Sequence, residues 1–208
     1  MMPDLTLFTN PMSRGRIARW MLEETGQPYR AEIVPFGTAM KSEEYRAVNP
    51  MGKVPAVRHG DTVITECAAI CAYLADTFPE AGLAPPTATR GSYYRWLFFA
   101  AGPLEAAVSN RVLGFVVPGD RSRMIGYGSF EDVMDTLEVA VSTNPFIAGK
   151  SFTAADVYVG SHIAWGFQFG TIEKRPAFAD YLARVTDRPA YARAGALDNA
   201  AMQEMQKA

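Results

Sequence analysis

Polar residues at the end of the first apolar run could stabilise an anion. Thr9, Asn10 and Ser13 follow Leu5–Phe8 and precede a helical pattern that begins at Arg16. A hydroxyl donor beside a helix N-terminus favours the charged form of a nearby acid, because the hydrogen bond and the helix dipole both act on it. Ser13 lies where both effects meet. Its plainer role is an N-cap for the same helix, and the two roles are compatible.

Glu66 and Cys67 stand where a strand pattern gives way to another helical pattern. Backbone N–H groups at a helix start attract a carboxylate, and Glu66 could pair with an ammonium group. Alternatively, Glu66 only complements the helix dipole. Cys67 and Cys71 are four residues apart rather than in a C-x-x-C arrangement, so we interpret Cys71 as a small core residue. The sequence leaves open whether Cys67 is redox-active.

Two further patterns concern backbone geometry. Val54–Pro55 is an X-Pro bond, for which the cis form costs only about 0.5–1 kcal/mol. The alternative is a trans proline that opens an edge strand. Further along, Thr153 and Asp156 have the spacing of a capping box, with Asp in place of the usual Glu or Gln.

An N-terminal α/β unit must position most of these residues. The order of patterns is βαβ followed by ββα, which predicts a four-stranded mixed sheet with helices on both faces. The expected strands are 5–8, 29–34, 54–57 and 63–65, and the expected helices are 16–25, a short one near 42–46, and 66–78.

The rest of the chain shows helical patterns only. They cover 91–115, 130–142, 153–167, 178–186 and 190–199, and they follow a segment rich in proline. We therefore predict an α/β domain over 1–79, a linker over 80–88 and an all-α domain over 89–208.

Composition excludes several classes of protein. The 208 residues are 49% hydrophobic and 20% charged with a formal charge of −2, which suits a globular core and argues against a nucleic-acid binder. The longest uncharged stretch, 157–172, is too short and too polar for a membrane span. Two cysteines and two histidines argue against a disulfide framework and against a zinc site, so we expect a cytoplasmic protein without a metal.

Three motifs give the chain a resemblance that covers nearly its whole length. They are Asn49–Pro55 (NPMGKVP), Ile64–Ile70 (ITECAAI) and Phe152–Asp156 (FTAAD), in this order after a βαβ unit. With them, the chain resembles the cytosolic glutathione transferases, which have a thioredoxin-like N-terminal domain and a helical C-terminal domain. The run from Pro11 to Glu24 is similar to bacterial members of the serine-type branch.

The resemblance implies an enzyme that adds the glutathione thiolate to a small hydrophobic electrophile, a reaction associated with detoxification. Ser13 stands where serine-type relatives carry their catalytic hydroxyl, with Thr9 and Asn10 as alternative donors and Arg16 as an electrostatic aid. Tyrosine-type and cysteine-type relatives carry their residue at positions that Leu7, Phe8 and Arg14 occupy here.

The same resemblance assigns the tripeptide-binding residues. It implies a cis Val54–Pro55 bond whose valine backbone pairs with the cysteinyl part of glutathione. The γ-glutamyl part would contact Glu66 and Cys67, where relatives usually carry Ser instead of Cys. Lys53 and Lys41 would hold the glycyl carboxylate. Asp156 is then a buried fold determinant rather than a catalytic residue.

The electrophile is expected in an apolar pocket between the two domains. The candidate lining residues are Met12, Phe36, Phe99, Arg111, Phe115, Trp165 and Phe169. The resemblance also implies a homodimer. Two other functions remain open. One is a glutathione-binding or structural protein without turnover, and the other is a thiol-exchange enzyme, which is expected to carry a cysteine in the loop after the first strand.

Overall fold

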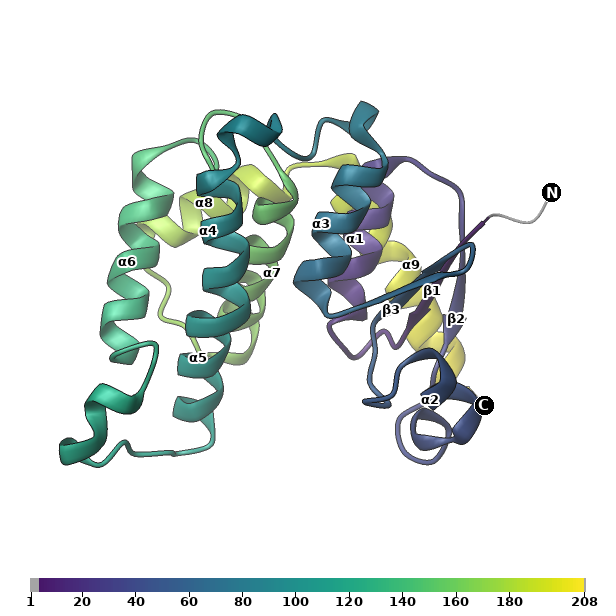
Figure 1. The fold of residues 1–208 in the computed structure, drawn as a ribbon, viewed down its shortest axis with the longest axis horizontal. Helices are drawn as coiled ribbons and strands as arrows, with labels where there is room; N and C mark the ends of the chain where they lie inside the picture. The colour runs from purple at the N-terminus through teal and green to yellow at the C-terminus, as the bar shows by residue number, and fades with distance from the viewer. Residues whose placement is uncertain (1–3, 208) are drawn as a thin grey trace. The chain divides into compact units, whose positions relative to one another are not determined.

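The computed structural model describes residues 4–207 (Figure 1), which divide into two compact units. Unit 1 contains the chain up to Ala84 together with the chain from Asp187 onward, and unit 2 runs from Pro85 to Thr186. Within residues 4–207, none of the helices is long and apolar enough to cross a bilayer.

Unit 1 is built on a mixed sheet in the order β2-β1-β3-β4. Its strands are β1 (Leu5–Thr9), β2 (Tyr29–Ile33), β3 (Ala56–His59) and β4 (Thr62–Thr65). β2 runs parallel to β1, whereas β3 is antiparallel to both β1 and β4. This arrangement confirms the predicted thioredoxin-like sheet.

Helices cover both faces of this sheet, as the alternation along β1 requires. α1 (Gly15–Thr25) and α3 (Cys67–Thr77) pack side by side (Figure 1). On the other face, Phe8 and Ala56 form a core cluster with Met40 and Tyr45, which come from η1 (Ala39–Lys41) and α2 (Glu43–Val48). The short turn η2 (Pro79–Ala81) follows α3.

The C-terminal helix α9 (Pro189–Met205) packs against α1 and so belongs to unit 1. The all-α domain predicted from the sequence, 89–208, includes this helix. A polar seam explains its position: Arg19 Nε lies 2.8 Å from Asp198 Oδ1, with both side chains almost fully buried. Arg188 also forms two 2.7 Å hydrogen bonds with the carboxylate of Glu24.

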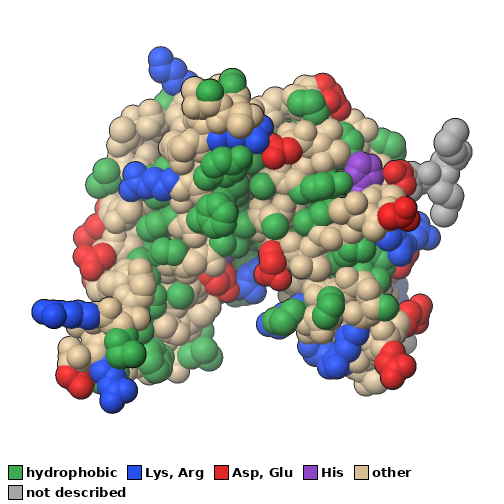
Figure 2. Space-filling model, in the orientation of Figure 1, with side chains coloured by type: hydrophobic (Ala, Val, Ile, Leu, Met, Phe, Trp, Pro, Cys, Tyr) green, Lys and Arg blue, Asp and Glu red, His purple; other side chains and the backbone are tan. Residues whose placement is uncertain are grey.

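Unit 2 is helical throughout its regular structure. Its α-helices are α4 (Gly91–Phe99), α5 (Glu105–Val112), α6 (Phe130–Thr143), α7 (Ala154–Phe169) and α8 (Pro176–Thr186). The turns η3 (Thr87–Thr89) and η5 (Gly119–Met124) lie between helices or before them. Some large apolar side chains stay exposed, such as Phe98, which is 72% exposed, and hydrophobic groups are visible over α4 in Figure 2.

The predicted helix over 91–115 is interrupted and shortened. A π-helical turn, η4 (Ala100–Leu104), separates α4 from α5 and contains Pro103. Proline has no N–H to donate, so a regular α-helical ladder cannot continue through it. α5 ends at Val112 because Gly114 adopts a left-handed φ of 69°, a common way to terminate a helix.

Candidate functional site

Three loops of unit 1 meet at one edge of the sheet. Phe8 pairs with Ala56, and Ala56 pairs with Thr65. Because β3 is antiparallel to its neighbours, the end of β1, the start of β3 and the end of β4 lie side by side. The sheet therefore brings together the loops that carry Ser13, Val54–Pro55 and Glu66.

Ser13 lies two residues before α1 and is half-buried. Its hydroxyl donates to the carbonyl oxygen of Asn10 at 2.7 Å and accepts from the N–H of Gly15 at 2.9 Å. The residue in the N-cap position is Arg14, and its side chain does not cap the helix. Ser13 Oγ is thus held at the N-terminus of α1, where the helix dipole favours an anion.

The alternative donors, Thr9 at the end of β1 and Asn10 in the loop that follows, are fully buried. Thr9 and Asn10 are both 0% exposed. The Asn10 amide donates to Val34 O at 3.0 Å, and its Oδ1 accepts from the N–H of Met12 at 3.0 Å. Arg16 donates from Nε to Pro11 O and from Nη2 to Asn199 Oδ1, so its guanidinium braces the loop against α9.

The second loop carries the Val54–Pro55 bond, which is cis, as the sequence analysis predicts. The carbonyl of Lys53 accepts from Tyr45 Oη at 2.8 Å and from Asn49 Nδ2 at 2.7 Å. Two groups therefore fix the backbone just before this bond. The side chain of Lys53 is exposed.

Lys41 supports the same loop from below the turn. Its Nζ donates to Met51 O at 3.0 Å and to Gly52 O at 2.8 Å. Gly52 has a φ of 56°, and a Cβ on it would lie 2.7 Å from Met40 O, so only glycine fits. The ammonium of Lys41 thus holds backbone carbonyls in this structure.

Burial raises the pKa of Tyr45 to about 12, because the interior disfavours the phenolate. Tyr45 in the unfolded chain ionises near pH 10, so this group makes the folded state lose stability as pH rises from about 10 to 12. We expect Tyr45→Phe to cost about 1 kcal/mol at pH 7, from the lost bond to Lys53 O. The variant should also show a smaller stability loss in alkali. Urea unfolding at pH 7 and above pH 10 tests this, and an equal alkaline loss in both proteins would contradict it.

The third loop ends at the start of α3. Glu66 is exposed and has a φ of 64°, the only positive φ of a non-glycine residue in the described chain. Such a backbone conformation is costly, and residues that adopt it cluster at functional sites. The first N–H groups of α3, an 11-residue helix, have no intrahelical acceptor and point out of its N-terminus.

Cys67 connects the third loop to the first. Its Sγ donates to Arg14 O at 3.6 Å, and its side chain is 8% exposed. Cys71 is 0% exposed, and a hydrogen bond with Cys67, together with burial, raises the pKa of the Cys71 thiol. The start of α3 is therefore tied to the start of α1, a link that spacing along the sequence does not reveal.

The seven residues predicted for the electrophile pocket are divided between the units. Met12 and Phe36 belong to unit 1 and are 58% and 52% exposed. In unit 2, Phe99 and Trp165 are half-buried, and the other three are exposed: Arg111, Phe115 and Phe169. Their role toward an electrophile stays a prediction.

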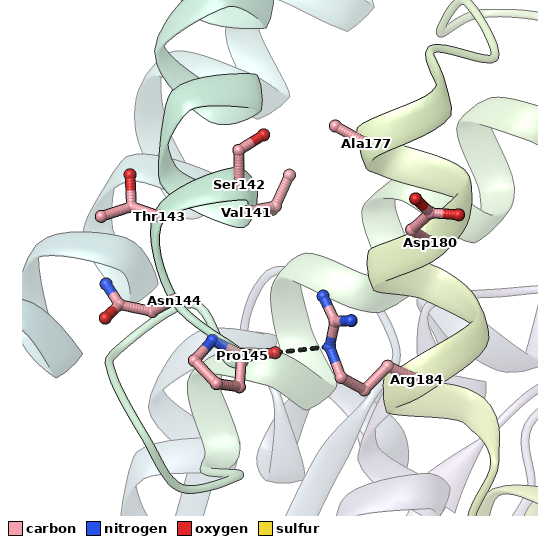
Figure 3. A pocket seen from close by; sticks show the side chains of 8 residues that line it. All are labelled: Val141, Ser142, Thr143, Asn144, Pro145, Ala177, Asp180 and Arg184. Atoms are coloured by element: carbon pink, nitrogen blue, oxygen red, sulfur yellow. Dashed lines mark hydrogen bonds between the residues drawn. The ribbon is translucent and has the colours of Figure 1, made fainter.

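Unit 2 also contains an open groove of about 490 Å³ between the end of α6 and α8 (Figure 3). Arg184 on α8 crosses it and donates from Nε to Pro145 O at 2.7 Å. Asp180 and Ser142 also line the groove. None of the residues predicted for the site lies there.

The comparisons with known proteins agree with this architecture. A family model described as the glutathione S-transferase N-terminal domain matches residues 12–77. Glutathione S-transferase 3 of Zea mays is 31% identical over 169 residues, which cover 74% of this chain and 75% of that protein. The chain belongs to the glutathione S-transferase family.

Solved structures extend the similarity to both units. A glutathione transferase from Methylococcus capsulatus has a TM-score of 0.78 and 28% identity, covering 94% of this chain and 98% of that chain. A sphingomonad glutathione S-transferase, solved in complex with glutathione, has a TM-score of 0.74 and 26% identity, covering 93% and 98%.

Proposed function

We propose that this protein binds glutathione at the edge of the unit 1 sheet and transfers its thiolate to a small hydrophobic electrophile. The observation that carries the proposal is the meeting of three loops there, which places a serine hydroxyl at one helix start and the open start of another beside it. A tripeptide with two carboxylates, an ammonium group and a thiol matches these groups.

Each part of glutathione has a candidate partner. The backbone of Val54, next to the cis Pro55, would pair with the cysteinyl unit. The N-terminus of α3, at Glu66 and Cys67, would hold the γ-glutamyl carboxylate, while Glu66 pairs with the ammonium. Lys53 would hold the glycyl carboxylate. Lys41 would be a second partner for it, in addition to the bonds that its Nζ donates to Met51 O and Gly52 O.

Ser13 would supply the chemistry. A free thiol has a pKa near 8.5, so a thiolate at neutral pH needs about 2.7 kcal/mol of preferential stabilisation for a shift of two units. A hydroxyl donor and a helix N-terminus together can provide this amount. The hydroxyl proton would turn from Asn10 O to the sulfur, while Gly15 N–H continues to donate to Ser13 Oγ.

Retention on immobilised glutathione, combined with a chlorodinitrobenzene assay, tests this function. We expect the protein to bind the resin, to elute with free glutathione and to turn over the electrophile. Retention without turnover on several electrophiles would favour a glutathione-binding protein instead. Absence of retention and of turnover would contradict both. A homodimer is the expected assembly, which light scattering during gel filtration measures.

A further inference from the structure

Two loops of the candidate site are built in the same way. Each begins Asn-Pro-Met, at residues 10–12 and at residues 49–51. In both loops the asparagine Oδ1 accepts from the methionine N–H at 3.0 Å. In both, the backbone carbonyl of the asparagine also accepts from the N–H of the residue three positions later. That residue is Ser13 in the first loop, at 3.0 Å, and Gly52 in the second, at 2.7 Å. Both asparagines are at least nine-tenths buried.

The two asparagine amides hold different groups. Asn49 Nδ2 donates to Lys53 O, just before the cis bond. Asn10 Nδ2 donates to Val34 O, which ties the first loop to the end of β2. A second tie joins the same segments, because the N–H of Val34 donates to Thr9 O at 2.8 Å.

The backbone of Asn10 also contacts the hydroxyl of Ser13. The backbone carbonyl oxygen of Asn10 accepts both from the Ser13 N–H and from Ser13 Oγ. When the hydroxyl turns to a sulfur, this carbonyl keeps its bond to the N–H, so no buried acceptor is left unsatisfied. The Ser13 hydroxyl can therefore exchange its hydrogen bond to the Asn10 carbonyl for one to the sulfur at little cost in free energy.

We propose that Asn10 is a positioning residue, which sets the place and the resting orientation of the Ser13 hydroxyl for the bound thiol. The inference rests on the proposed function. Asn10 does not touch the thiol itself, because it is 0% exposed and both polar groups of its side chain are engaged. Its amide fixes the loop, and the fixed loop aims the hydroxyl.

The test is a double-mutant cycle read by the ultraviolet absorbance of the bound thiolate as a function of pH. We expect Asn10→Ala to raise the pKa of the bound thiol by about one unit. At a pH below the thiol pKa values of both the wild type and the variant, kcat should then fall roughly tenfold. In a Ser13→Ala background, Asn10→Ala should raise the thiol pKa no further, because it acts through the hydroxyl. Asn10→Asp keeps the acceptor for Met12 N–H but replaces the donor to Val34 O with an acceptor, so it should leave the thiol pKa raised.

Asn49→Ala is the matched control, since it removes the equivalent side-chain hydrogen bonds from the other loop. We expect it to raise the KM for glutathione and to leave the thiol pKa unchanged. Equal effects of Asn10→Ala in both Ser13 backgrounds, or a change in KM alone, would overturn the proposed role of Asn10. A wild-type protein that binds no glutathione would refute the proposed function, and the role of Asn10 with it.

Discussion

Replacing Asp156 with alanine is expected to lower the free energy of unfolding by about 3–5 kcal/mol. The carboxylate is 0% exposed, and each oxygen accepts two hydrogen bonds. Oδ1 accepts from Ile147 N–H at 2.8 Å and from Tyr181 Oη at 2.9 Å. Oδ2 accepts from the N–H and the hydroxyl of Thr153, at 2.9 and 3.1 Å. Alanine would leave these buried donors without their acceptor, and each unsatisfied group is costly.

The helix α6 provides a matched control, because Asp132 caps it in the same way. Its Oδ2 accepts from the N–H and hydroxyl of Ser129 at 3.2 and 2.7 Å, but the side chain is exposed. Asp132→Ala should cost only about 1 kcal/mol, since water replaces the lost partner. Urea unfolding of both variants measures the contrast. Similar losses would show that burial of the Asp156 network adds nothing to a simple helix cap.

The capping box at Asp156 shows which contacts spacing can predict. Thr153 and Asp156 are three residues apart, so their reciprocal bonding follows from a local pattern. The bonds to Ile147 and Tyr181 depend on where a preceding loop and α8 pack. The sequence therefore predicts the helix start, and only the structure shows that the carboxylate joins three segments of unit 2.

The candidate site divides in the same way. The cis bond, the helix start after Glu66 and the serine before α1 are local features, and their sequence motifs predict them. The bonds from Asn10 to Val34 and from Cys67 to Arg14 span 24 and 53 residues. Such contacts depend on strand register and helix packing, which no spacing rule specifies. For this reason the sequence allows Asn10 to be a donor to the thiol, whereas in the structure its amide donates to Val34 O and fixes the loop that carries Ser13.

The C-terminal helix shows a further limit of the pattern. Its helical periodicity is readable, but periodicity does not say which neighbour a helix covers. The partner is set by the pairing of Arg19 with Asp198, which are 179 residues apart. This buried pair joins α9 to α1, and so to the unit that carries the candidate site.

Replacing Ser13 with alanine is expected to raise the pKa of the bound glutathione thiol by about one to two units, because a hydrogen bond to a charged group contributes about 1.5–3 kcal/mol. The wild-type thiol should titrate below its free value. At a pH below both thiol pKa values, kcat/KM should fall about 10- to 100-fold, in proportion to the lost thiolate. The loss should shrink as pH rises past the pKa of the variant, because both proteins then hold the thiolate.

Ser42→Ala is the control for helix capping. The Ser42 hydroxyl accepts from the N–H of Tyr45 at 3.2 Å at the start of α2, in the same unit. Its loss should cost about 1 kcal/mol of stability and leave the thiol pKa unchanged. The thiolate absorbance and the pH profile of conjugation separate the two variants. If Ser13→Ala behaves like Ser42→Ala, the hydroxyl of Ser13 only caps α1, and the thiol of glutathione must be activated by the helix N-terminus or by another donor.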